Sequence, residues 1–150
     1  MNAPHPPEEE MLRFGVDALR PVLEPHGFTF RMGEAGKGSG GYFASGFFEH
    51  GERVLEFHVR HGLGLVSYRI SQAELSHEMY LRYAGRWAQR RYPNFGGTIL
   101  ESFQALAQDI AAFGQDFASG GGTEFLAFVA QHSINPNRFK GFASLGKNDG

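Results

Sequence analysis

The spacing of apolar residues changes twice along this chain, and these changes limit the fold class. The first segment is helical, because its apolar residues recur at intervals of three to four: Leu12, Val16, Leu19 and Leu23. The acidic run Glu8, Glu9 and Glu10 suits the positive end of a helix dipole. The Pro25-His26-Gly27 sequence predicts the end of this helix.

From Phe28 the apolar period becomes two, which is typical of half-buried strands. We predict four strands, in residues 28–32, 42–50, 55–60 and 65–70, joined by short links as an antiparallel meander. In the third strand Leu55, Phe57 and Val59 should face inward. The glycine-rich stretch 33–41 is predicted to be an irregular, flexible connection.

The rest of the chain returns to helical spacing. Ser71 and Glu74 match a capping box, which predicts a helix running to about Arg90. Thr98 and Glu101 form a second box, followed by the apolar residues Phe103, Leu106, Ile110, Phe113 and Phe117. Thr123 is predicted to cap a short last helix. The fold class is therefore α+β: an N-terminal helix, a four-stranded antiparallel meander, then two to three helices packed on one sheet face.

Length and composition predict one domain. A chain of 150 residues has the usual size of a single domain. We expect residues 1–7 to be a disordered leader, 8–132 to form the domain, and 133–150 to be a polar, partly docked tail. The chain has no cysteine, which excludes disulfides and thiolate chemistry. It shows neither a signal peptide nor a membrane span, so we expect a cytoplasmic protein.

Residues that could carry catalysis or bind a metal do not form a recognisable motif. His58 and His61 stand three apart on a strand and leave opposite faces, so no metal site is expected. The glycine-rich stretch with Lys37 lacks the spacing of a phosphate-binding loop, and no cofactor is expected. Asp109 and Asp116 share a helix face and are interpreted as solvated acids. The histidines are interpreted as surface or partner-facing residues. We expect the chain to be a non-catalytic protein more than an enzyme.

Charged residues on the outer faces of two strands suggest a binding platform. Glu56, His58 and Arg60 should point outward on one strand, with Arg69 beside them on the next. Arg82 and Arg86 begin a cluster of arginines on the following helix. We predict that these six residues face a protein partner, although an ordinary solvated strand face has the same pattern. The formal net charge of −2 argues against nucleic acid.

The element order resembles that of small bacterial α+β proteins of unknown function, and is similar in kind to immunity proteins encoded beside polymorphic toxins. Four stretches carry this resemblance: residues 57–64, 75–77, 92–93 and 103–117. It implies a small, cytosolic, non-catalytic, partner-binding protein, such as an immunity protein that neutralises a cognate bacterial toxin.

Two alternatives remain open. A pocket between the sheet and the helices, with Tyr68, His77 and Tyr80 in it, would indicate a small-molecule-binding or enzymatic domain. Pairing through a strand edge or a sheet face would indicate a homodimeric structural module.

Overall fold

The structure is a computed structural model that describes residues 7–94 and 97–139. Its first element, helix α1 (Pro7–Leu23), places Pro7 at its start and three glutamates in its first turn. The short helix η1 (Glu24–His26) follows and ends at Gly27. The predicted leader lies outside the described residues apart from Pro7. The predicted tail is described only to residue 139, and its first two residues belong to the last helix.

Five antiparallel strands follow in a meander, so the α+β class and the antiparallel sheet are confirmed. They are β1 (Thr29–Gly38), β2 (Gly41–His50), β3 (Arg53–Val59), β4 (Leu63–Ile70) and β5 (Ala73–Ser76). Their order in the sheet is the order of the sequence. Leu55, Phe57 and Val59 are fully buried, as the alternation on β3 predicted.

The fifth strand was not predicted, because Ser71 and Glu74 match the capping-box pattern of a helix start. Ser71 has a φ of +54° and lies in the tight turn between β4 and β5 instead of capping a helix. Glu74 accepts a hydrogen bond from the Ser67 hydroxyl at 3.1 Å across the sheet. The following helix, α2 (His77–Tyr83), is capped by Ser76, whose hydroxyl accepts from the Met79 amide at 3.1 Å. The helix is therefore far shorter than predicted.

The prediction that residues 33–41 form an irregular connection was also wrong. The strands β1 and β2 remain paired to the end of the hairpin, where Gly38 lies opposite Gly41. Backbone pairing needs no side chains, so a run of glycines can still form a ladder. A register shift between Met32 and Ala35 absorbs the one irregularity in this pairing.

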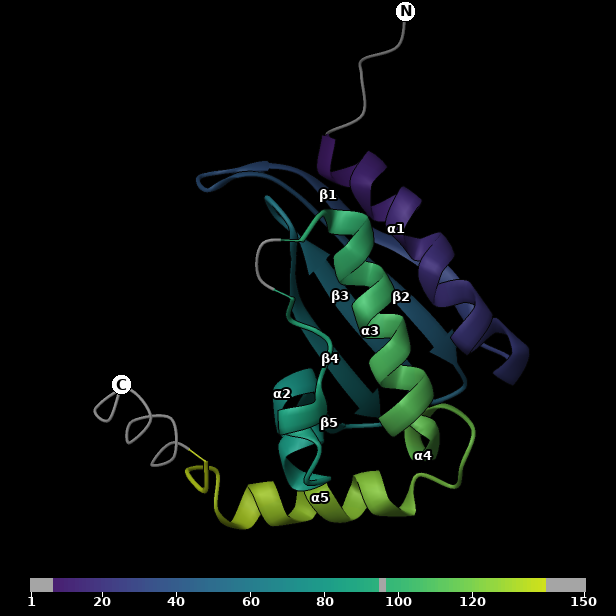
Figure 1. Cartoon of the computed structure of the whole chain (residues 1–150), viewed down its shortest axis with the longest axis vertical. Helices are drawn as coiled ribbons and strands as arrows, with labels where there is room; N and C mark the ends of the chain where they lie inside the picture. The colour runs from purple at the N-terminus through teal and green to yellow at the C-terminus, as the bar shows by residue number, and fades with distance from the viewer. Residues whose placement is uncertain (1–6, 95–96, 140–150) are drawn as a thin grey trace, which may run out of the picture.

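The described helices cover one face of the sheet, and the core lies between these two layers (Figure 1). The helix α3 (Ile99–Phe113) lies beside α1 across the sheet. Both predicted features of α3 are confirmed, namely the capping box of Thr98 with Glu101 and the buried stripe that includes Phe103 and Ile110. Phe117 extends this buried stripe from the next helix, α4 (Gln115–Ala118).

The last described helix, α5 (Thr123–Ile134), crosses the end of the molecule below α2 and α4 (Figure 1). Its N-cap is Gly122 with a φ of +80°, and the predicted Thr123 cap is wrong, since Thr123 is the first helical residue. A short helix η2 (Trp87–Gln89) follows α2. No helix within the described residues is long and apolar enough to cross a membrane.

Candidate functional site

A cluster of mostly half-buried arginines and aromatic rings surrounds Trp87, where helix α2 ends. Gly85, with a φ of +72°, turns the chain after α2 and leads into η2, which begins at Trp87. A left-handed backbone at this point favours glycine because it carries no Cβ. The reversal brings Trp87 back beside Arg82 on the last turn of α2. We call the following residues the Trp87 surface: Arg82, Tyr83, Trp87, Arg90, Arg138 and Phe139.

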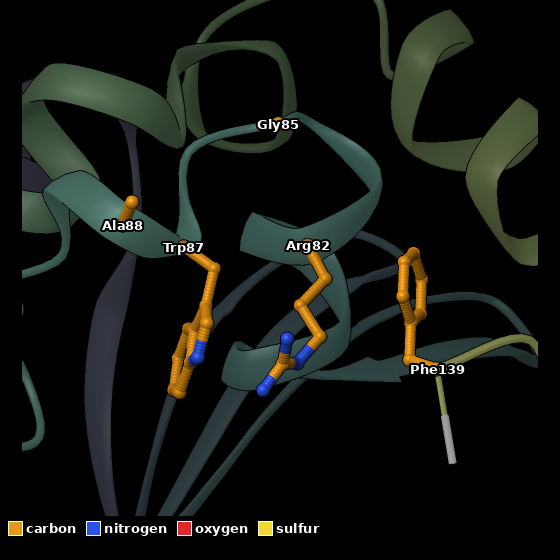
Figure 2. Close-up of a pocket in the computed structure, with 5 residues that line it drawn as sticks. All are labelled: Arg82, Gly85, Trp87, Ala88 and Phe139. Carbon is orange, nitrogen blue, oxygen red and sulfur yellow. The ribbon is translucent and has the colours of Figure 1, made fainter. Parts of the chain in front are cut away.

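Two guanidinium groups lie over the Trp87 ring. The Arg82 guanidinium carbon is 4.9 Å from the ring centre, and that of Arg90 is 4.2 Å from it. Figure 2 shows Arg82 between Trp87 and Phe139. The Arg82 guanidinium carbon lies 5.9 Å from the centre of the Phe139 ring. Cations are attracted to the electron-rich faces of aromatic rings, so these contacts hold the two half-buried arginine side chains in place.

The other part of the Trp87 surface comes from the end of the described chain. The Arg138 guanidinium lies 5.3 Å from the Tyr83 ring and 5.2 Å from the Phe139 ring. The rings of Tyr83 and Phe139 meet edge to face at 4.9 Å. His132 on α5 hydrogen-bonds the Tyr83 hydroxyl through Nδ1 at 3.1 Å. Segments near residues 83 and 138 therefore pack into one surface.

Positive charge exceeds negative charge around Trp87. Glu78 accepts a hydrogen bond from Arg82 Nε at 2.7 Å, and it pairs with no other arginine of this surface within the described residues. Arg90 donates to the Trp87 carbonyl oxygen at 3.1 Å, while its Nε is buried without a hydrogen-bond partner in the described part of the chain. Arg90 and Arg138 therefore keep charge that no carboxylate of the described residues neutralises.

A hollow of about 280 Å³ opens at the centre of this surface. Arg82, Trp87 and Phe139 form its walls together with Gly85 and Ala88 (Figure 2). A second hollow of about 220 Å³ adjoins the other side of Trp87, next to Tyr92, Pro93 and residues 64–66 of β4. In the first hollow, an apolar or aromatic side chain of a partner would contact the Trp87 and Phe139 rings and lie next to the Arg82 guanidinium.

The six platform residues predicted from the sequence do not lie together. Glu56, His58 and Arg69 share the sheet face that the described helices leave open. There Glu56 bonds His58 Nε2 at 2.7 Å and faces Arg69 at 3.7 Å. Arg60 lies apart at the β1–β2 turn, with its guanidinium 5.7 Å from the Phe43 ring. Arg82 belongs to the Trp87 surface, and Arg86 lies near the Phe113 ring at the end of α3.

Charges on the open sheet face are mostly paired with one another. Arg31 binds Glu49 with two hydrogen bonds of 2.9 and 3.2 Å. These hydrogen bonds raise the pKa of Arg31 and lower the pKa of Glu49. Arg69 also lies 3.9 Å from Glu74. A partner that covered this face would have to desolvate charges that are already neutralised by one another. The open sheet face therefore offers a partner less favourable binding free energy than the Trp87 surface does.

The alternative pocket residues come together mainly in the core: Tyr68 and Tyr80 are buried there, and His77 alone of the three also lines the second hollow, beside Trp87. Tyr68 donates its hydroxyl proton toward His77 Nδ1 at 2.8 Å, and His77 Nε2 lies 3.0 Å from Asp109 Oδ2. A carboxylate accepts hydrogen bonds, which assigns the His77 proton to Nε2. Tyr80 packs edge to face on Tyr68 at 5.0 Å. Burial raises the pKa of Tyr68 well above its ordinary value, and it raises that of Tyr80 too.

Two interpretations of single residues were wrong because burial overrode the sequence pattern. Asp109 is 1% exposed and His77 is 3% exposed, so neither is a surface group. Asp109 also accepts the amides of Arg91 and Tyr92 at 2.8 and 2.9 Å. It therefore fixes the 90–94 segment to α3, a role that helical periodicity alone does not reveal.

Trp87, Arg138 and Phe139 were not predicted from the sequence as members of a site. One available signal was the alternation of arginines with tyrosine and tryptophan between residues 82 and 91. Residues 138 and 139 join the Trp87 surface only through tertiary packing against Arg82 and Tyr83, which the local sequence does not reveal. No group of three or more metal-ligating side chains occurs among residues 7–94 and 97–139.

Comparisons of the chain with protein-family models, with curated proteins and with solved structures found no match.

Proposed function

We propose that this chain is a non-catalytic protein-binding domain that captures an acidic partner through the Trp87 surface. The observation that carries this proposal is the placement of Arg82 and Arg90 over the Trp87 ring, beside a hollow lined with aromatic side chains. Tryptophan, tyrosine and arginine are the residues that contribute most energy at protein interfaces.

The geometry favours binding because these side chains are held before a partner arrives. Arg82 is fixed by Glu78 and by two rings, and Arg138 is fixed by Gln131 Oε1 at 3.1 Å and by two rings, one of which, Phe139, both arginines share. Ordering a long side chain at an interface costs about 0.5–1.5 kcal/mol, so prior ordering lowers the free-energy cost of association. A partner with carboxylates around an apolar side chain matches the charge and shape of this surface.

Catalysis has less support. Tyr68, His77 and Asp109 form a hydrogen-bonded series, but Tyr68 is 1% exposed and Asp109 has three hydrogen-bonding neighbours that hold it in the core. An immunity protein would be one form of the proposed function, and its acidic partner would then be the toxin that it neutralises.

The test is capture from the native host's lysate with four tagged forms of the chain, followed by binding of the purified, identified partner. Wild type is compared with Trp87→Ala, with Arg82→Ala/Arg90→Ala, and with Arg13→Ala/Arg20→Ala on α1 as a matched control. We expect the two Trp87-surface variants to bind at least about tenfold more weakly, and the control to bind as wild type does. A stable homo-oligomer that captures no partner would contradict the proposal.

A further inference from the structure

A third hollow, of about 220 Å³, lies at the opposite end of β2 from the glycine-rich hairpin. It is lined by His26 of η1, His50 at the end of β2, Arg53 at the start of β3, and residues 118–120 after α4. We infer that this hollow binds the phosphate group of a small molecule, either inorganic phosphate or a small phosphomonoester. This inference does not depend on the Trp87 surface.

The lining of this hollow is basic. His26, His50 and Arg53 carry nitrogen donors, and no carboxylate lines it. Two acids on the neighbouring elements have partners of their own. Glu24 accepts from Arg20 at 2.6 Å, and Asp116 Oδ2 accepts from the Phe125 amide at 2.8 Å. An oxyanion would therefore meet donors and no direct repulsion from a lining group.

Several of these donors are free to bind a ligand. Arg53 NH1 donates to the carbonyl oxygens of Phe117 at 2.6 Å and Asp116 at 3.4 Å, which fixes the guanidinium at the end of α4. The other Arg53 nitrogens have no acceptor in the described part of the chain. His26 and His50 likewise make no hydrogen bond within residues 7–94 and 97–139. Guanidinium and imidazole groups without acceptors are the groups that bind phosphate oxygens.

The position of His50 depends on a glycine. Gly27 has a φ of +97°, and a Cβ on it would overlap the His50 imidazole. The bare backbone of Gly27 therefore lets His50 lie directly beside the segment that carries His26. The Phe28 ring, 5.6 Å from the His50 ring, supports the imidazole from the core side. The two histidines and Arg53 are thus brought together by packing.

The volume of the hollow limits the ligand. Pockets for drug-sized ligands measure about 300–1,000 Å³, and one water occupies about 30 Å³. A space of about 220 Å³ suits a phosphate with a few waters or a short ester substituent. A nucleotide would extend well beyond it.

The experiment is a titration of the whole chain with sodium phosphate at a pH of about 6.5, where free histidine is about half charged. The backbone amide signals of Ser119 and Gly120 are followed by NMR, because these residues remain in every variant. We expect saturable shifts that sodium chloride of equal ionic strength does not produce. His26→Gln/His50→Gln should weaken binding at least about tenfold, and His58→Gln on the open sheet face should not.

Shifts no larger than those in sodium chloride would overturn the inference, as would equal affinity for phosphate in the double variant. A parallel titration with glycerol 3-phosphate separates the two ligand sources. Tighter binding of the ester supports a phosphomonoester, and tighter binding of phosphate supports the free anion.

Discussion

The His77 Nε2 atom lies 3.0 Å from Oδ2 of Asp109, and this contact joins the start of α2 to the middle of α3 inside the core. The same carboxylate receives the amides of Arg91 and Tyr92. One buried acid therefore holds together α2, α3 and the segment that follows η2. Trp87 and Arg90 of the Trp87 surface lie in the chain between α2 and the Arg91 and Tyr92 amides that Asp109 binds, so their position depends on this contact.

Removal of the Asp109 carboxylate should destabilise the protein strongly. Asp109→Ala leaves the Arg91 and Tyr92 amides and His77 Nε2 without their acceptor. We expect the free energy of unfolding to fall by about 3 kcal/mol or more in urea denaturation. Asp17→Ala is the matched control, because Asp17 is exposed and pairs only with Arg20 among the described residues. A similar, small loss in both variants would refute this role for Asp109.

Tyr68→Phe should have a smaller effect on the same network. The substitution removes the hydroxyl that lies 2.8 Å from His77 Nδ1 and leaves that buried nitrogen without a donor. The expected loss of unfolding free energy is about 1–3 kcal/mol, measured by chemical denaturation. Tyr42→Phe, at an exposed position, should change it by less than about 0.5 kcal/mol. Equal stability of the Tyr68→Phe variant and wild type would contradict the assigned hydrogen bond.

Stability should decrease at alkaline pH. Burial raises the pKa of Tyr92 from 10.0 to about 12 and also raises the pKa values of Tyr68 and Tyr80. Below the ordinary pKa both states are neutral at these positions. Above it the unfolded chain loses protons that the folded chain keeps, so the free energy of unfolding falls as pH rises.

Urea denaturation from pH 9.5 to about 11.5 measures this effect. Tyr92→Phe should show a shallower decrease over this interval than wild type, because one of the three buried phenols is gone. The variant will be less stable at every pH, since the Tyr92 hydroxyl donates to the carbonyl oxygens of Leu63 and Gly64. An unchanged slope would mean that Tyr92 ionises equally in both states.

The open sheet face should be dispensable for partner capture. His58→Ala/Arg60→Ala removes one side chain paired with Glu56 and one that lies over Phe43. Since these are exposed contacts, we expect a change in unfolding free energy within about 1 kcal/mol. Partner affinity, measured by calorimetry, should stay within about threefold of wild type. A loss of binding without a loss of stability would place the partner on the sheet face or at Arg60 beside the β1–β2 turn.

Most of the fold could be predicted from residue spacing, because amphipathic periods reflect which face is buried. The stripe on α1, the alternation on β3 and the Thr98 capping box each depend on neighbours in the sequence. The strand β5 could not be predicted in this way. It spans only four residues, and Ser71 and Glu74 match a helix start equally well.

The candidate site was harder to predict because it depends on long-range packing. Arg82 was identified from the arginine cluster, but its partner ring Phe139 lies 57 positions further along the chain. Asp109 looked like a solvated acid because its burial is caused by the segment that holds Arg91 and Tyr92. Periodicity shows which face of a helix is apolar, but it does not show what packs against a polar residue on that face.

The most direct test of the protein-binding account uses the one tryptophan of this chain. Protein labelled with 5-fluorotryptophan gives a single ¹⁹F signal from position 87, and an unlabelled partner adds none. If the partner binds the Trp87 surface, this signal changes its chemical shift in proportion to the complex formed with the purified partner, and Arg82→Ala/Arg90→Ala prevents the change at equal concentrations. An unchanged chemical shift in a complex demonstrated by size-exclusion chromatography would show that the partner binds elsewhere.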